Sequence, residues 1–163
     1  MKTKTILVSL VSGLIGFVAG VAFWYLAGPL FFDQEVNESI SASDAQTVLA
    51  EGSFKDADSL HKGTGRATIF EGEGGRRTLR FTDFRVTNGP ALEVWLVEKA
   101  EIGSSEDVEN GAYVSLGRLK GNVGDQNYDI PADVDLSKYA SVVIWCEQFS
   151  VLFSPATLAT PAS

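Results

Sequence analysis

The sequence contains very few residues of the kinds that form disulfides or bind metals. Its 163 residues include one cysteine, Cys146, one histidine, His61, and one methionine, the initiator Met1. A single cysteine cannot form a disulfide within the chain, so packing alone must hold the fold. A blue-copper site needs two histidines and a cysteine, structural zinc needs four such ligands, and iron–sulfur clusters need several cysteines. One copy of the chain supplies none of these ligand sets.

The same scarcity limits how one chain holds haem. Bis-histidine and histidine–methionine ligation are excluded, and the Cys-x-x-Cys-His motif of covalently attached haem is absent. His61 with Cys146 is the remaining intramolecular ligand pair, so haem bound by these two residues stays one alternative. His61 lies in a polar, turn-like stretch, and we interpret it as a solvated loop histidine unless the fold brings it to the thiol.

Basic residues are scarce as well. The chain has 13 Lys and Arg against 21 Asp and Glu, which gives a formal net charge of -8, and its cations form no cluster. Because nucleic-acid binding draws its affinity from clustered cations, we expect no nucleic-acid partner. A conventional hydrolase is also disfavoured, since one loop histidine and no nucleophile elbow do not make a catalytic triad.

A long apolar run occupies the start of the sequence. No charged residue occurs from Ile6 to Phe32, Lys2 and Lys4 precede the run, and acidic residues follow it. About 20 apolar residues cross a bilayer as a helix, so we expect residues 6–28 to form a transmembrane signal anchor. The positive-inside rule then places residues 1–5 in the cytoplasm and the C-terminal domain outside it.

Two further features of this run leave alternatives open. Gly20-Val21-Ala22 resembles a signal-peptide cleavage site, so cleavage is the alternative to a permanent anchor. Gly16 and Gly20 have the small-xxx-small spacing that lets two membrane helices pack closely, which suggests a helix–helix dimer. After the run, residues 29–51 are polar and acidic, and we interpret them as a tether with a short helix that starts after Ser43.

From Gly52 onward, short β-type segments alternate with turn residues. The segments are rich in β-branched and aromatic residues, and Gly, Asn, Asp or Pro bounds each of them. This pattern predicts an all-β domain at residues 52–159, an antiparallel β-sandwich or partly closed barrel of about 7–9 short strands, followed by a tail at 160–163. The predicted strands are 64–70, 78–84, 92–97, 113–116, 126–130, 142–146 and 149–153.

Cys146 ends the most apolar of these segments. Val142 to Cys146 is apolar on both faces, as in a strand buried in the middle of a sheet. Val142, Ile144 and Cys146 share one face of this strand, whereas Trp145 points to the opposite face, where packing is its expected role. The lone thiol is therefore either a small buried hydrophobe or a redox-active group.

A set of segments spread over residues 52–158 matches, in order, the pattern of one known family. The segments are Gly52-Ser53-Phe54 with His61, Leu79 to Phe84 with Asn88-Gly89-Pro90, Leu116 to Asn122, Gly124 to Tyr128 before Pro131, Val142 to Cys146, and Phe149 to Phe153. Together they resemble the DM-thirteen domain, also called the electron-transfer DM domain. The resemblance implies a β-rich extracytoplasmic module suspected of redox work, in which the cysteine after the tryptophan is the reactive group, as a bare thiol or bound to haem.

Two functions from different classes therefore remain. The first is a membrane-anchored redox or electron-transfer domain centred on Cys146, with His61 as a second ligand if haem is bound and with a redox or protein partner. The second is a non-catalytic adhesion or ligand-binding β module in which Cys146 is structural, because the sequence offers no triad, metal cluster or nucleotide loop. Neither function makes the protein a conventional enzyme.

Overall fold

The computed structural model describes residues 2–40 and 47–161, and within the N-terminal helix it describes the side chains of Lys4, Ile6 and residues 8–24. The chain divides into two compact units, Met1–Phe32 and Asp33–Ser163. The first unit is the helix α1 (Lys2–Phe31), which extends beyond both ends of the span predicted at residues 6–28. Among the described residues, no helix is both long enough and apolar enough to cross a membrane, so the transmembrane span predicted at 6–28 is not confirmed.

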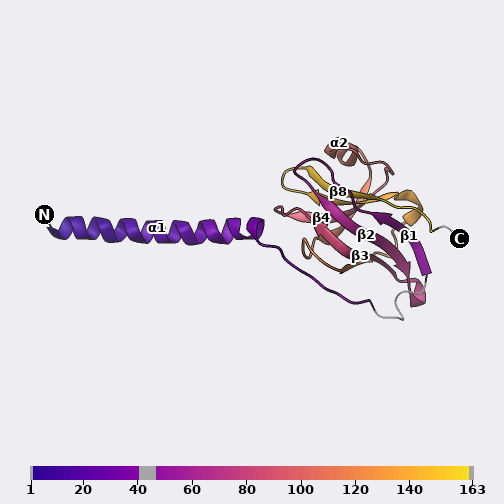
Figure 1. Cartoon of the computed structure of the whole chain (residues 1–163), viewed down its shortest axis with the longest axis horizontal. Helices are drawn as coiled ribbons and strands as arrows, with labels where there is room; N and C mark the ends of the chain where they lie inside the picture. Colours follow the sequence, from indigo (N-terminus) through magenta and orange to yellow (C-terminus); the bar gives the residue numbers. More distant parts are fainter. Residues whose placement is uncertain (1, 41–46, 162–163) are drawn as a thin grey trace. The chain divides into compact units, whose positions relative to one another are not determined.

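The second unit is a sandwich of two four-stranded antiparallel sheets (Figure 1). In spatial order, the first sheet contains β1 (Thr47–Ser53), β2 (Gly63–Glu71), β3 (Arg77–Val86) and β6 (Gln126–Ile130). The second sheet contains β5 (Tyr113–Arg118), β4 (Leu92–Val97), β7 (Ser141–Cys146) and β8 (Val151–Thr157). The predicted all-β fold is thus confirmed, and the strand β7 that carries the cysteine is one of the two inner strands of its sheet.

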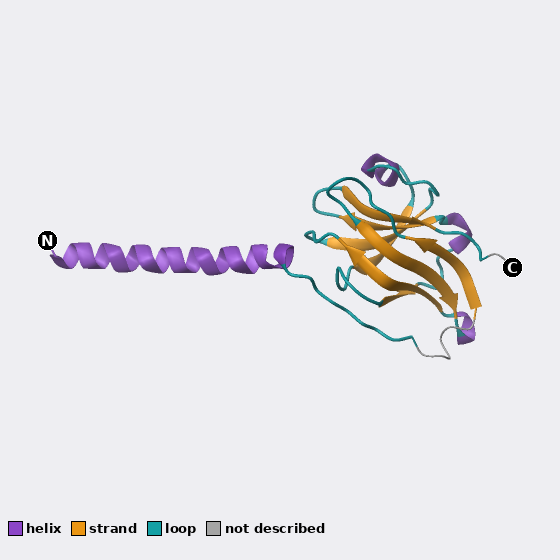
Figure 2. Cartoon of the chain, viewed as in Figure 1, coloured by secondary structure: helices purple, strands orange, loops and turns teal. Residues whose placement is uncertain are grey.

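Short helices lie in the connections outside the strand layers, as Figure 2 shows. They are the α-helix α2 (Ser105–Glu109) and the 3-10 helices η1 (Glu73–Gly75) and η2 (Leu136–Lys138). The Asp107 carboxylate holds the start of α2 by accepting hydrogen bonds from the backbone N–H groups of Gly103 and Ser104. This arrangement lets the fully buried Val108 pack on the outer face of the second sheet.

The two sheets are joined along one edge, where β1 meets the chain that follows β8. Glu51 and Ala159 exchange two backbone hydrogen bonds of 2.9 and 2.8 Å. Close by, the Lys55 N–H donates to the Pro155 carbonyl at 3.0 Å. The sequence left a sandwich and a partly closed barrel open, and the structure is a sandwich with this one edge linked.

The predicted strand limits agree closely with the observed ones, with differences at both ends of the domain. The sequence did not predict β1, and the helix expected after Ser43 begins on residues 41–46, which lie outside the described residues, while Thr47 to Ala50 belong to β1. The last strand begins at Val151 rather than Phe149. Its delay follows from Ser150, whose φ of 52° belongs to a turn and not to an extended strand.

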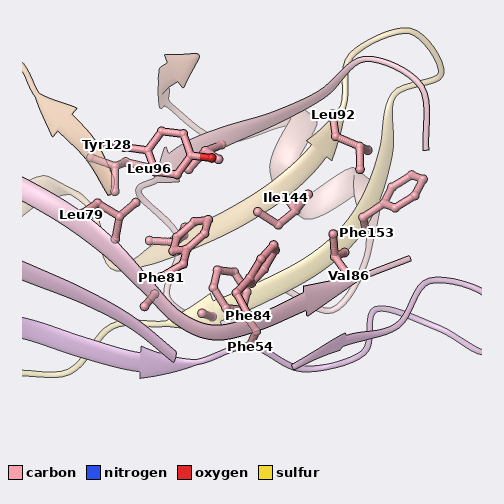
Figure 3. Packing of buried hydrophobic residues seen from close by; sticks show 14 of the residues in the cluster. Phe54, Leu79, Phe81, Phe84, Val86, Leu92, Leu96, Tyr128, Ile144 and Phe153 are labelled. Atoms are coloured by element: carbon pink, nitrogen blue, oxygen red, sulfur yellow. The ribbon is translucent and has the colours of Figure 1, made fainter. Parts of the chain in front are cut away.

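Aromatic rings fill the space between the sheets (Figure 3). The Phe54 ring lies edge-on to Phe81 and Phe84, with centroids 4.8 and 4.9 Å away. Phe81 and Phe84 both point inward although their positions differ by an odd number of residues, because Asp83 between them takes a φ of 50° and shifts the strand register. Gly65 makes room on the neighbouring strand, where a Cβ would lie 2.6 Å from the Phe84 Cα.

Residues 33–39, which we call the strap, belong to the β domain although the sequence analysis placed them in a tether. The Val36 N–H donates to the Val123 carbonyl at 2.9 Å, and the Asn127 side chain donates to the Ser39 carbonyl at 3.0 Å. The strap lies so close to the domain that a Cβ on Gly124 would be 2.2 Å from the Val36 carbonyl oxygen. The polar stretch before the first strand is therefore built into the domain over these residues.

Candidate functional site

Cys146 is the last residue of β7 and lies completely inside the domain. It pairs with Leu92 on β4 and with Val151 on β8, so a strand covers it on each side. Its exposed fraction is 0%, and it belongs to the same core cluster as Val142 and Ile144. The predicted shared face of these three residues is confirmed, because alternate residues of an extended strand point to the same side.

A turn formed by residues 88–91, which we call the covering turn, closes the end of the sandwich over the thiol. The Cys146 Sγ–H donates a hydrogen bond of 3.0 Å to the Pro90 carbonyl oxygen. The Gly89 backbone approaches the core so closely that a Cβ there would lie 2.5 Å from the Phe153 Cζ. On the other side, the Ala91 carbonyl accepts a 3.2 Å hydrogen bond from the Glu147 N–H. A residue larger than glycine at position 89 would displace this turn.

His61 is held at the same end of the sandwich, in the loop between β1 and β2. Its Nδ1 lies 2.7 Å from an Asp58 carboxylate oxygen, and its side chain is 22% exposed. The hydrogen bond from the His61 side chain, followed by those from the His61 and Leu60 N–H groups, lowers the pKa of Asp58 to about 2. The imidazole packs on the Phe153 ring with a centroid distance of 4.3 Å.

The two candidate residues thus face the same region, but they do not interact directly. His61 reaches the core through Phe153, which belongs to the cluster that contains Cys146. Each residue already has its own hydrogen-bond partner, Asp58 for His61 and Pro90 for Cys146. The His61 imidazole is therefore not placed as a base or as a co-ligand for the thiol.

These surroundings do not fit a haem. A thiolate ligand must present its sulfur to an iron atom at the centre of a wide, flat ring, whereas the Cys146 sulfur has no exposed surface and lies among packed side chains. Within residues 2–40 and 47–161, no three His, Cys, Asp or Glu side chains gather in a way that could hold a metal ion. The pairing of Cys146 with His61 as haem ligands, which the sequence left open, finds no support in this geometry.

A second group of redox-capable side chains lies on the outer face of the second sheet. Tyr113, Trp95 and Trp145 come from β5, β4 and β7, and we call them the aromatic stripe. The Tyr113 and Trp95 rings stack with centroids 3.8 Å apart, and the Trp95 and Trp145 centroids are 5.3 Å apart. The sequence predicts packing for Trp145 and does not single out the other two residues, because only the strand register brings the three rings together.

A hollow of about 270 Å³ adjoins the covering turn. Its lining includes Lys62, Arg85 and Asn88, the first residue of that turn. The two cations are each paired with an acid, Lys62 with Asp56 at 2.9 Å and Arg85 with Asp33 at 3.0 Å. The hollow is thus a solvent-open surface next to the covering turn, lined mostly by polar and charged residues.

The comparisons with known proteins concern the β domain alone. The family model described as "Electron transfer DM13" matches residues 53–158. No curated protein and no solved structure matches the chain at a significant level. The matched range includes β2 to β8, the covering turn, His61 and Cys146, and it amounts to well over half of the sequence. The chain therefore belongs to the electron transfer DM13 family.

Proposed function

We propose that the β domain is an electron-transfer module in which Cys146 is the redox-active group. The family match supports the redox role, and its range, residues 53–158, includes Cys146. Cys146 also carries the only sulfur in that range, because the one methionine of the chain is Met1. Thiols are the side chains that proteins most readily oxidise and reduce in a reversible way. The match of a domain with a single thiol to an electron transfer family is the observation that carries the proposal.

The chemistry that suits a lone thiol is exchange with a disulfide of a partner protein. The Cys146 thiol loses its proton to solvent, and the thiolate sulfur attacks one sulfur of the partner disulfide. That disulfide breaks, a mixed disulfide with Cys146 forms, and the second partner sulfur leaves as a thiolate. Cys146 is oxidised in this step and the leaving sulfur is reduced, and attack by another thiol reverses it.

Access to the sulfur requires the covering turn to open. The bonds that hold the turn include those from the Cys146 thiol to Pro90, from the Glu147 N–H to Ala91 and from the Asn88 side chain to Asp33. None of these three belongs to the ladder that joins β4 to β7, so the turn can lift while the sheet stays paired. Loops with few buried contacts open at a lower free energy than the whole domain. The thiol is therefore protected while the turn is closed and reactive while it is open.

The test is the rate at which Cys146 of the folded, full-length protein exchanges with an aromatic disulfide reagent. Gly89→Ala places a methyl group against Phe153, and overpacking of this kind costs about 1–3 kcal/mol. Because about 1.4 kcal/mol is tenfold in an equilibrium, we expect Cys146 to react about tenfold faster in this variant. Gly103→Ala is the matched control, since its new Cβ would make only an ordinary contact of 3.6 Å with Asp107.

The control variant should react at the wild-type rate, and Cys146→Ser should give no signal. Equal rates in Gly89→Ala and the wild type, in variants with unchanged circular dichroism, would contradict the role of the covering turn. A thiol that stays unreactive until the whole domain unfolds would contradict the redox role of Cys146 itself.

One observation favours a second function, a non-catalytic binding module with a structural cysteine. The Cys146 side chain is fully buried and its thiol is hydrogen-bonded, which is how free cysteines in protein cores are usually found. Under this function, Cys146→Ser and Cys146→Ala change stability but leave partner binding intact. Under the redox function, both variants abolish covalent exchange with a partner while the fold remains.

We also propose that residues 6–28 anchor the domain in a membrane, with residues 1–5 in the cytoplasm and the β domain outside it. The proposal is supported by the charge-free run from Ile6 to Phe32 and by the lysines that precede it. Alkaline carbonate extraction of cell membranes should leave the full-length protein in the pellet, and protease added outside the cytoplasm should cleave the β domain. Release of the intact chain by carbonate would contradict the anchor.

Such an anchor would allow two copies of the chain to form a helix–helix dimer through Gly16 and Gly20. Within the single chain, a Cβ on either glycine would meet nothing within 4 Å, so both positions have room for a second helix. Replacing both by leucine should abolish crosslinked dimers in membranes, because close helix packing needs small residues. A dimer that survives both replacements would contradict this interface.

A further inference from the structure

The aromatic stripe crosses the second sheet diagonally, because Tyr113 pairs with Val97 and Trp145 pairs with Glu93, two residues to either side of Trp95. Trp95 stacks face to face on Tyr113, with ring planes only 6° apart, and it contacts Trp145 at an angle of 31°. The stripe begins at Tyr113 on the edge strand β5 and runs through β4 to the inner strand β7. Three oxidisable rings therefore form a continuous series of close contacts.

The burial of the stripe increases in one direction. Tyr113 is 50% exposed, Trp95 is 7% exposed and Trp145 is 3% exposed. The buried side chains Ile102 and Val108 belong to the same cluster as the two tryptophans and shield them from water. The series thus has one end open to solvent at Tyr113 and a buried end at the residue just before Cys146.

A carboxylate is placed to receive the proton of the central indole. The Trp95 Nε1–H donates a 2.8 Å hydrogen bond to Glu93 Oε2, and the Ser115 hydroxyl donates to the same oxygen at 2.8 Å. Removing one electron from an indole makes its N–H far more acidic. The proton can then move along the existing hydrogen bond, and neither the Trp95 nor the Glu93 side chain has to shift for it.

From these contacts we propose that the aromatic stripe is a one-electron transfer route, with Tyr113 as its contact to solvent and Glu93 as its proton acceptor. A one-electron oxidant docked over Tyr113 gains one electron, Trp95 loses one electron, and its Nε1 proton passes to the Glu93 carboxylate. Trp95 is left as a neutral radical beside a protonated Glu93. An electron from Trp145, with return of the proton from Glu93, restores Trp95 and leaves Trp145 as the one-electron-oxidised radical cation. This inference rests on the proposed electron-transfer function but uses none of the Cys146 chemistry.

Packing alone does not need this combination. An apolar side chain at position 95 would cover the sheet equally well, without a stacked, half-exposed ring above it or a carboxylate on its ring nitrogen. Transfer of an electron coupled to a proton needs both features. The relevant step is therefore the oxidation of Trp95, which an experiment can follow directly.

The test uses photogenerated tris(bipyridine)ruthenium(III) as the one-electron oxidant and transient absorption as the readout. The full-length Trp24→Phe variant is the background, because Trp24 is exposed and would be oxidised directly, and the chain has only three tryptophans. In this background we expect the band of the neutral tryptophan radical. Tyr113→Phe should delay its appearance, whereas Tyr139→Phe, the matched control away from the stripe, should not.

Two further variants test the central steps. Trp95→Phe should abolish the radical signal, because the remaining Trp145 is buried and has lost its contact to the surface. Glu93→Gln keeps the shape and can still accept the hydrogen bond, but it cannot take the proton, so the spectrum should shift to the protonated radical cation. An unchanged radical yield in Trp95→Phe, or an unchanged neutral radical in Glu93→Gln, would overturn the proposal.

Thermal unfolding of each variant shows whether the fold is kept. Where Trp95→Phe keeps the fold and loses the radical signal, the conservative Trp95→Tyr should restore a radical signal. Cys146→Ser in the same background separates this proposal from the proposed function. A normal radical in Cys146→Ser leaves the aromatic route valid even if disulfide exchange at Cys146 is disproved.

Discussion

Replacing Glu38 tests whether the strap is part of the folded domain. The Glu38 carboxylate accepts hydrogen bonds of 2.8 and 2.9 Å from the Lys120 ammonium group and one of 2.8 Å from the Asn127 N–H. Its carbonyl also accepts a bond from Arg80 at 3.0 Å. A flexible tether would lose nothing when Glu38 is replaced. A strap built into the domain loses these side-chain bonds.

The expected loss follows from the exposure of the groups involved. The Glu38 and Lys120 side chains are 34% and 42% exposed, so the ion pair itself contributes at most about 1 kcal/mol. Glu38→Ala also leaves the part-buried Asn127 N–H without its acceptor, which costs about 1–2 kcal/mol after allowance for solvent. We therefore expect Glu38→Ala to lower the free energy of unfolding by about 2 kcal/mol, and Glu38→Gln by about half as much.

Urea unfolding of the full-length protein, followed by circular dichroism, measures this loss. With an m-value of about 2 kcal/mol/M, the midpoint for Glu38→Ala should fall by about 1 M. Glu109 is the matched control, because it is an exposed glutamate on α2 and its replacement by alanine should leave the midpoint almost unchanged. A Glu38→Ala midpoint that equals the control would refute the reasoning and restore the flexible tether.

The pH gives an independent check on the same contact. Partial desolvation raises the pKa of Glu38, but the hydrogen bonds from Lys120 and Asn127 outweigh it and hold the pKa below its ordinary value of 4.5. A lowered pKa stabilises the fold above that value, and this stabilisation is lost as the pH falls through the pKa of the folded state. The midpoint difference between the wild type and Glu38→Gln should therefore shrink on acidification.

Three further predictions concern other parts of the domain. Gln126→Leu should destabilise the domain by about 3 kcal/mol in urea unfolding, because the buried Gln126 side chain is hydrogen-bonded to the Gly121 backbone and to the Tyr128 hydroxyl. Gln148→Leu, at an exposed position, should leave the stability unchanged. Bonds from Lys99, Gly103 and Ser104 lower the pKa of Asp107 to about 2, so Asp107→Asn should lose less stability than the wild type between pH 4 and pH 2. Added haem should give no thiolate-ligated spectrum, in the wild type as in Cys146→Ser.

The sequence predicted the strands whose residues alternate between polar and apolar or are apolar throughout. The burial of Cys146 followed from the same pattern. It did not predict β1, because the β1 residues are partly or fully exposed and the segment around Glu51 is polar. β1 is an edge strand, so it pairs with β2 on one side and keeps much of its surface in water. Such strands carry a weak apolar signal and depend on their neighbour for their position.

The strap was missed for a different reason. Its partners are distant in the sequence, since Glu38 binds Lys120 and Asn127, and no local pattern announces pairing over such a separation. The acidic composition of this stretch predicts solvated side chains, whereas in the structure Asp33 pairs with Arg85 and Glu38 pairs with Lys120. Gly121 and Gly124 were a usable signal, because close approach of two backbones requires residues without a Cβ.

The candidate site was predicted in part. The thiol, its strand face and the turn signal at Asn88-Gly89-Pro90 are visible in the sequence, but the closure of that turn over the sulfur is not. The aromatic stripe depends on the register that sets Trp95 against Val143 and Glu93 against Trp145. Register arises from long-range pairing, so a single sequence does not reveal which side chains meet across strands.

The measurement that tests the central claim most directly is the exchange rate of Cys146 in the folded, full-length protein as a function of urea. Opening of the covering turn exposes little surface, so the rate should stay nearly constant from zero urea to the foot of the unfolding transition. Above that point the exchange rate should rise steeply with urea, because global unfolding then exposes the thiol. An exchange rate that depends this steeply on urea all the way down to zero urea would contradict the account, because Cys146 would then react only when the whole domain unfolds.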